Sequence, residues 1–211
     1  MSDSKSPIGR IRDDTIRYLG KELAYVDGQP SAFARFLIVL RLILITPGYQ
    51  FVLSRRVQEL LLYIPVLGRP LRRVVWWFSC LAFGSEIAIA SEIGGGLYIP
   101  HPFGIVVGVS DIDRNVTILQ NVTVGRKGLN GKERPRIESG VQLSAGAVVV
   151  GNITVGHDSV VGANAVVTRD VPPCSLAMGI PARISPLIRQ SSASIHPSPS
   201  LARDPDIHAE I

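Results

Sequence analysis

The stretch GGGLYIPHPFGIVVG, residues 94–108, places one histidine, His101, between two prolines. A neutral imidazole can take a proton from a hydroxyl group near neutral pH, which is the chemistry of a general base. The flanking prolines stiffen the backbone around the ring, because proline fixes φ. A lone histidine in a turn is also a common solvated surface residue. The function of His101 therefore depends on the elements that position it.

Isoleucine recurs at every sixth residue around this histidine, at Ile87, Ile93, Ile99 and Ile105. The spacing resumes after one extra residue and again after a loop, at Ile112, Ile118, Val124, Ile137, Leu143, Val149, Val155, Val161 and Val167. A six-residue period is neither helical nor that of an ordinary strand. It predicts a parallel β-helix, in which stacked coils bury a continuous core. The composition agrees, since the chain is 46% hydrophobic but only 6% aromatic, which favours many short aliphatic strands.

Together with NVTILQNVTVG, VQLSAGAVVVGNITVGHDSVVGANAVVTRDVPP and MGIPARI, these segments resemble the hexapeptide-repeat acyltransferases. The likeness is to the serine acetyltransferase branch, including its relatives that acetylate surface polysaccharides, and it covers most of residues 86–184. The resemblance implies a mainly β fold, a left-handed parallel β-helix preceded by an N-terminal α-helical region. It also implies acetyl-CoA as the co-substrate and a homotrimer or a larger homo-oligomer.

The resemblance assigns the catalytic role to His101. In this family a histidine at that place in the motif deprotonates an acceptor hydroxyl as it attacks the acetyl thioester. A carboxylate on the preceding coil orients the imidazole, and counting back through the repeat gives Glu86, where serine acetyltransferases usually have aspartate. Glu92 is the alternative orienting residue. Glu86 also has a purely structural interpretation, as a solvated residue at the entry to the β-helix.

Coenzyme A in this family lies in a groove between two neighbouring β-helices. By motif position, Gly125, Ala145 and Ala163 would hold the pantetheine arm, and Arg183 would contact a phosphate. Small residues suit the groove because a bulky side chain would fill it, although packing between coils would favour the same residues. Nothing around Cys174 in VPPCS suggests an activated thiol, so we expect direct transfer without a covalent enzyme intermediate.

A basic loop, RKGLNGKERPR, interrupts the repeat at residues 126–136. Its substrate-binding candidates are Arg126, Lys127 and Arg134, and its alternative is a solvated loop. In serine acetyltransferases the matching loop has an arginine–histidine pair that helps hold the amino acid, and an aspartate directly precedes the catalytic histidine. This chain has Glu133 and Arg134 instead of the pair, and Pro100 instead of the aspartate. We therefore expect a sugar hydroxyl of an exopolysaccharide or its precursor as the acceptor, with serine as the alternative.

Two other classes on this fold are disfavoured. A metal-dependent hydratase needs three histidine ligands, and only His101 and His157 lie in the repeat, so we expect no metal. A non-catalytic scaffold would have no need of the intact His101 motif. We also expect no nucleic-acid partner.

Residues 1–85 are expected to form helices that cover the first coil. One helix is predicted over Thr15–Val26, and two or three over Ala32–Phe83 with breaks near Pro47 and Pro65. Residues 31–84 carry seven arginines and one glutamate on an apolar background, but no run reaches the roughly 18 residues that span a bilayer. Two interpretations stay open: peripheral contact with a membrane, or packing against the domain and neighbouring subunits.

The chain begins without the apolar core of a signal peptide, and its two cysteines lack metal-ligand spacing. We therefore expect a cytoplasmic protein, at the inner face of the membrane if the helices bind lipid. Residues 185–211 are rich in Ser, Pro and Ala without an apolar period, which predicts a disordered tail.

Overall fold

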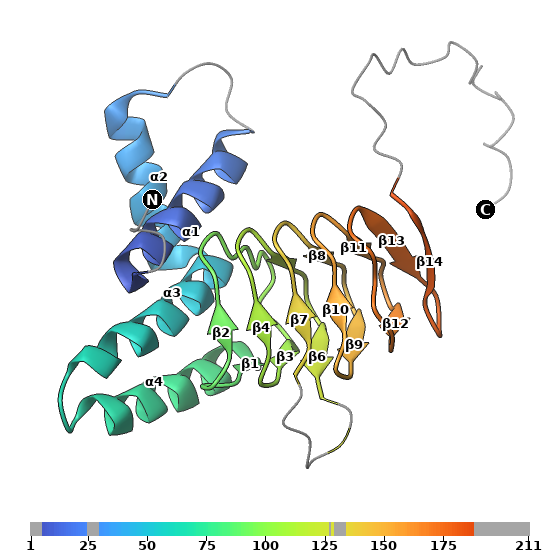
Figure 1. Cartoon of the computed structure of the whole chain (residues 1–211). Coiled ribbons are helices and arrows are strands. Elements are labelled where there is room, and N and C mark those ends of the chain that lie inside the picture. The colour runs from blue at the N-terminus through green and yellow to red at the C-terminus, as the bar shows by residue number, and fades with distance from the viewer. Residues whose placement is uncertain (1–5, 25–29, 127, 129–133, 188–211) are drawn as a thin grey trace, which may run out of the picture.

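The computed structural model describes residues 6–24, 30–126, 128 and 134–187. Helices come first along the chain and lie at one end of a column of short strands (Figure 1). The helical elements are α1 (Pro7–Leu23), α2 (Ala32–Ile45), α3 (Pro47–Leu60), the 3-10 helix η2 (Leu61–Tyr63) and α4 (Gly68–Phe83). The predicted disordered tail, residues 185–211, begins too early, because β14 (Arg183–Pro186) extends into it. The rest of the tail, beyond residue 187, lies outside the described residues.

Local signals set the ends of these helices. The first helix begins at Pro7 rather than at the predicted Thr15, because the Ser6 hydroxyl accepts the Gly9 N–H at 3.0 Å and proline suits a first helical turn. The predicted break near Pro47 is present, although this proline opens α3 at once. The predicted break near proline 65 separates η2 from α4.

The strands form three sheets, and each coil gives one strand or bridge to each sheet in turn. Sheet A contains β1 (Glu86–Ile87), β3 (Val106–Val107), β6 (Thr123–Gly125), β9 (Val148–Val150) and β12 (Val166–Val167). Sheet B contains β2 (Glu92–Ile93), β4 (Asp111–Ile112), β7 (Arg136–Ile137) and β10 (Thr154–Val155). Sheet C contains β5 (Thr117–Ile118), β8 (Gln142–Leu143), β11 (Val160–Val161), β13 (Ser175–Met178) and β14 (Arg183–Pro186). All pairings are parallel except β13 with β14, so the chain forms a parallel β-helix.

The core is the stack of aliphatic side chains inside the coils. In sheet A, Val107 lies between Ile87 and Val124 and is fully buried. The repeat predicted Ile105 at the position that stacks on Ile87, and this prediction is wrong. Val107 occupies that position, and Ile105 is buried two residues before it. The stacked residue follows Ile99 by eight residues instead of six. The additional residues lie in the turn that contains the histidine of the opening motif, so the repeat is lengthened at that point.

The helices satisfy backbone groups of the first coil that have no neighbouring strand. Arg56 is fully buried and donates to the Ile93 carbonyl at 3.0 Å, while Asp14 at 2.8 Å and Glu59 at 3.1 Å pair with its guanidinium. Burial lowers the pKa of Arg56, but the two carboxylates outweigh burial and raise it above its ordinary value. The buried cation is therefore both paired and hydrogen-bonded, as a charge in the interior must be.

Further arginines of the basic segment also turn inward. Arg55 donates to the Ser91 carbonyl at 2.7 Å, and Arg72 donates to the Ile89 carbonyl at 2.7 Å. These contacts favour the packing interpretation of the segment over the lipid interpretation, because the guanidinium groups are engaged by the protein's own backbone. Among the described residues no single helix is long and apolar enough to cross a membrane. The α2 helix passes that test only in combination with α3 and η2, as a pair bent by 78°.

Candidate active site

His101 lies in the turn that leads from sheet C into sheet A, named here the C–A corner, and its side chain is exposed. Buried Ser85 holds this turn: its hydroxyl donates to the Pro102 carbonyl at 3.0 Å and accepts the Ile105 N–H at 2.9 Å. Within the turn, the Phe103 N–H donates to the His101 carbonyl at 2.9 Å. The backbone of the turn is thus fixed while the imidazole faces solvent.

Two helices fix the chain just before this turn. The Tyr18 hydroxyl on α1 contacts both backbone groups of Ile99. At the start of α3, Gly48 approaches the same segment so closely that a Cβ there would collide with the Ile99 carbonyl and lie 3.1 Å from the Pro100 carbonyl. Glycine is required at this close approach.

The two candidate orienting carboxylates lie on different faces of the β-helix. Glu86 opens β1 in sheet A, directly after Ser85, which holds the turn of His101. Glu92 opens β2 in sheet B, which does not border the C–A corner, and its carboxylate lies 3.5 Å from the Arg134 guanidinium. This placement favours Glu86. Within the described part of the chain no hydrogen bond joins it to the imidazole, so the orienting role stays a prediction.

Further turns stack on the turn of His101 and form a column along the C–A corner. The Asn121 N–H donates to the Phe103 carbonyl at 2.9 Å, and the Asn164 N–H donates to the Ala145 carbonyl at 2.9 Å. Of the predicted cofactor residues, Ala145 is half-buried and Ala163 is exposed. Both lie in this column, in line with the histidine.

Gly125 lies at the opposite edge of sheet A, at the end of β6, where it pairs with Val150. A Cβ added to Gly125 would meet no atom within 4 Å apart from its chain neighbours. Packing between coils of one chain therefore does not demand glycine at this position. The absence of a side chain instead leaves open space beside the sheet.

Arg183 lines a cavity of about 740 Å³ beyond the last strand of sheet A. The Ala182 N–H donates to the Val166 carbonyl at 2.8 Å, which places the cavity wall against β12. Arg169 also lines the cavity and donates to the Ala182 carbonyl at 3.4 Å. The other lining residues are Thr168, Met178, Gly179, Ile180, Pro181 and Ala182. Two guanidinium groups in one cavity suit a phosphate-bearing ligand.

The basic loop is described only in part. Arg126 follows Gly125 at the edge of sheet A and is half-buried. Lys127, the second loop candidate, lies outside the described residues, and so does Glu133.

Arg134, the third loop candidate, lies over sheet B. Its Nε is 2.8 Å from Asp111 Oδ2, and its side chain is 34% exposed. Sheet B is the face opposite the C–A corner. One chain therefore does not bring Arg134 next to His101.

Residues 134–169 match the family described as "Bacterial transferase hexapeptide (six repeats)". The serine acetyltransferase of Escherichia coli (strain K12) is 45% identical over 106 residues, which make up 49% of this chain and 39% of that protein. The chain thus spans about two fifths of the length of this curated relative.

Solved structures agree over more of the chain. A serine acetyltransferase in complex with cysteine has a TM-score of 0.70 and 32% identity, covering 85% of this chain and 70% of that one. A serine acetyltransferase in complex with CoA has a TM-score of 0.68 and 31% identity, with the same coverage of both chains. The fold is thus the parallel β-helix that the repeat predicted, with the left-handedness that the resemblance implied.

The stacked coils, the six-residue repeat and these similarities define the class of protein as a hexapeptide-repeat transferase. The chain belongs to the hexapeptide-repeat acyltransferases, in their serine acetyltransferase-like branch.

Three residues around the site were not found from the sequence: Tyr18, Gly48 and Arg169. The first two act through helix-to-coil contacts, which leave no local pattern in the chain. Arg169 could have been found from the repeat. It follows Val167 of β12 by two residues, and Arg126 follows the valine of β6 by the same spacing.

Proposed function

We propose that this chain is an acetyl-CoA-dependent O-acetyltransferase. The proposal rests on one observation: exposed His101 stands at the head of the turn column that contains Ala145 and Ala163 and runs toward the cavity of Arg183. The likeness to a solved serine acetyltransferase in complex with CoA supports it. The activity is proposed for the site in this chain, since the relatives from E. coli are longer proteins.

In the proposed reaction His101 takes the proton from the acceptor hydroxyl as its oxygen attacks the thioester carbonyl carbon. A C–O bond forms, the C–S bond breaks, and the electron pair leaves with sulfur, which receives the proton as the CoA thiol. A well-placed general base contributes about 10²- to 10⁴-fold in rate. Burial, together with the nearby charge of Glu86, raises the pKa of the Cys80 thiol, so this cysteine is not an activated nucleophile.

Sheet A is the proposed support for coenzyme A. Four coil steps of about 4.8 Å separate the turn of His101 from residues 178–182, a distance of about 19 Å. Ala163 in the turn column and Gly125 at the other edge of sheet A leave room on this face for a pantetheine arm. At its far end Arg169 and Arg183 would bind phosphate groups, because a guanidinium forms charge-assisted hydrogen bonds with phosphate oxygens.

We further propose that the working form is a homotrimer or a larger homo-oligomer. In one chain the path along sheet A is an open surface, so a second chain is needed to close it into a groove. Light scattering of dilute protein, combined with acetyl-CoA turnover, tests this. A fully active monomer would contradict the shared groove.

The comparisons favour serine as the acceptor, in place of the sugar hydroxyl predicted from the loop sequence. Each relative and solved structure reported above is a serine acetyltransferase. We therefore propose serine O-acetylation as the first candidate activity.

A sugar hydroxyl is kept as the second candidate because of the acceptor-side residues. Pro100 cannot supply the carboxylate that would pair with an ammonium group, and Glu133 and Arg134 replace the arginine–histidine pair. Arg134 is already paired with Asp111 at 2.8 Å, so a serine carboxylate would have to compete for it. Each lost charge-assisted contact weakens binding by about 1.5–3 kcal/mol.

Release of the CoA thiol should be measured with serine beside a panel of nucleotide-sugars and oligosaccharides. Saturable release with serine supports the first candidate, and saturable release with a saccharide alone supports the second. Absence of acceptor-dependent release with all of them, in protein that binds acetyl-CoA, would refute the proposed transferase activity for these acceptor classes.

A further inference from the structure

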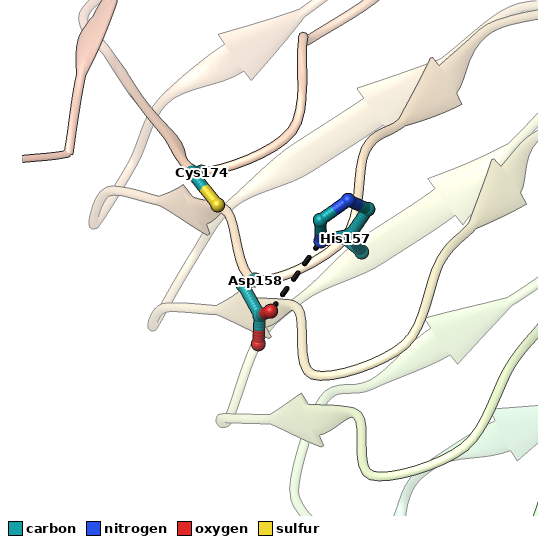
Figure 2. A group of neighbouring side chains, drawn as sticks. All are labelled: His157, Asp158 and Cys174. Atoms are coloured by element: carbon teal, nitrogen blue, oxygen red, sulfur yellow. Dashed lines mark hydrogen bonds and ion pairs between the residues drawn. The ribbon is translucent and has the colours of Figure 1, made fainter.

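A second group of reactive side chains lies away from the His101 site, where the turns lead from sheet B into sheet C. His157 and Asp158 lie between β10 and β11, and Cys174 lies directly before β13. Their imidazole nitrogen, carboxylate oxygen and thiol sulfur all lie within 4.8 Å of one another. Figure 2 shows the three side chains around a common space, with the Cys174 sulfur on the side of the other two residues. None of them has a part in the proposed acetyl transfer.

The backbone holds these three residues in place. The Cys174 N–H donates to the His157 carbonyl at 2.8 Å, and the Asp158 N–H donates to the Ser139 carbonyl at 2.9 Å. The backbone N–H of the histidine donates to Glu138 Oε2 at 2.9 Å. The side chains therefore project from stacked turns rather than from a loose loop, which reduces the entropy lost when a ligand orders them.

The turn itself does not explain the cysteine. Among the described residues of the β-helix, the non-glycine positions with left-handed φ are Asn115, Asn121, Asp158, Asn164 and Cys174. Asparagine and aspartate tolerate this conformation best because their short polar side chains bond locally. A thiol has no such advantage, so its presence beside an imidazole and a carboxylate points to the chemistry of the sulfur.

A thiolate, an imidazole and a carboxylate are the three ligand types that Zn²⁺ takes in proteins. Zinc–nitrogen and zinc–oxygen bonds of about 2.0–2.1 Å at tetrahedral angles place two such ligand atoms about 3.3 Å apart. His157 Nδ1 and Asp158 Oδ2 are 3.4 Å apart, which is long for a charge-assisted hydrogen bond and close to that ligand spacing. The sulfur lies within 4.8 Å of both atoms, and a zinc ion shared by all three ligands would require it to lie about 3.5 Å from each.

We propose that His157, Asp158 and Cys174 form a zinc site with a fourth position open to water. It differs from the three-histidine hydratase site weighed from the sequence, and only a positive metal-binding experiment would replace the expectation that the chain binds no metal. The ion would join the turn before β13 to the turn of the preceding coil. It would thereby stabilise the end of the β-helix, independently of acetyl transfer.

The test uses the tag-free full chain, reduced with a phosphine and freed of metal by a chelator that is then removed. In a titration near neutral pH, one equivalent of Co²⁺ per chain should bind. The bound ion should show the visible absorption bands of tetrahedral cobalt and a thiolate-to-cobalt charge-transfer band. Addition of Zn²⁺ should displace the cobalt and remove these bands. Zinc at a hundredfold excess over its Kd should raise Tm by about 5–10 °C. Absence of both the cobalt bands and the Tm shift would overturn the proposal.

Substitutions assign the ligands. Cys174→Ser should abolish the charge-transfer band and the Tm shift, and Asp158→Asn, which suits the left-handed turn, should weaken cobalt binding about tenfold or more. Cys80→Ser and the pair His196→Asn with His208→Asn are matched controls that should keep full binding. Metal uptake that survives both Cys174→Ser and His157→Gln would place the ion elsewhere and overturn the proposal. Acetyl transfer should persist in Cys174→Ser, so the two proposals fail separately.

Discussion

The hydroxyl of Tyr18 on α1 is bonded twice to one residue of the first coil, Ile99. It donates to the Ile99 carbonyl at 2.8 Å and accepts the Ile99 N–H at 3.0 Å. Both residues are buried, and Ile99 stands two residues before His101. A helix side chain thus satisfies backbone groups that a neighbouring strand would otherwise pair. The helical region thereby sets the position of the turn that carries the proposed base.

Tyr18→Phe removes both of these hydrogen bonds and leaves two buried backbone groups unpaired. We expect the free energy of unfolding to fall by about 2–6 kcal/mol, because each of the two unsatisfied buried groups costs about 1–3 kcal/mol. Urea unfolding at fixed protein concentration measures the change. Tyr63→Phe is the matched control, since the Tyr63 side chain is 74% exposed and its loss should change little. Equal effects of the two variants would contradict the role of Tyr18.

Tyr18 also predicts a dependence of stability on alkaline pH. Burial raises the pKa of the Tyr18 phenol well above its ordinary value of 10, although its hydrogen bond with Ile99 lowers it. The folded state keeps this proton while the unfolded chain loses it, so stability present below pH 10 should fall as the pH rises above about 10. The Tyr18→Phe variant should lose stability less steeply over that range. Urea midpoints measured from pH 8 to 11 test the difference in slope.

Gly48→Ala places a methyl group against the Ile99 carbonyl, and the start of α3 must shift to accommodate it. We expect a destabilisation of about 1–3 kcal/mol and a lower rate of acetyl transfer, because the displaced segment leads into the turn of His101. Gly20→Ala in α1 is the control, since its Cβ would meet nothing within 4 Å. Alanine there should stabilise by about 0.5–1 kcal/mol, as it does in exposed helix positions. A neutral Gly48→Ala would show that the contact can relax.

His101→Asn should retain the fold and acetyl-CoA binding but lose about 10²-fold or more in kcat, because only the proton acceptor is removed. Glu86→Gln should lose less than His101→Asn and more than Glu92→Gln, since Glu86 follows the residue that holds the turn of His101 and Glu92 lies on another face. Steady-state kinetics of CoA release measure all three variants. Undiminished turnover in His101→Asn would show that the chemistry lies elsewhere.

Arg183→Gln should raise the KM for acetyl-CoA about tenfold or more, because it removes a charge-assisted phosphate contact worth about 1.5–3 kcal/mol. Arg169→Gln should act in the same direction, since both residues line one cavity. The control is a change of co-substrate: with acetyl-pantetheine, which lacks the phosphates, neither substitution should matter. An equal loss with both co-substrates would indicate a structural effect on the cavity instead.

Much of the β-helix follows from the aliphatic spacing, because each short strand must bury one side chain in the coil interior. The spacing misplaced Ile105 because the length of a turn is set by its own backbone and not by the core. Inward arginines such as Arg55 and Arg56 could not be distinguished from lipid-facing ones, since pairing with backbone carbonyls depends on tertiary contacts. In the candidate site, Ala145 and Ala163 lie in one line with His101, because stacked turns inherit their positions from the repeat, while their role toward coenzyme A stays a prediction.

The proximity of Cys174 to His157 could also have been predicted from the repeat. Cys174 follows His157 by 17 residues, close to one coil, so counting coils would have placed the two side chains one above the other. The immediate sequence neighbours of Cys174 do not indicate this relationship, because it depends on the stacking of the coils.

The paired backbone at the start of the β-helix has a consequence for self-association. A bare first coil would offer rows of open N–H and C=O groups, on which the coil of another molecule could add and from which a fibril could grow. The buried guanidinium of Arg56, which covers the Ile93 carbonyl, blocks strand addition at this end of the β-helix. An incoming strand would have to displace a cation that two carboxylates hold, and this displacement would be costly. At the other end, antiparallel β14 covers the edge of β13 and reverses the chain direction. Proteolytic loss of the helices would therefore expose the first coil as an open sheet edge on which a fibril could grow.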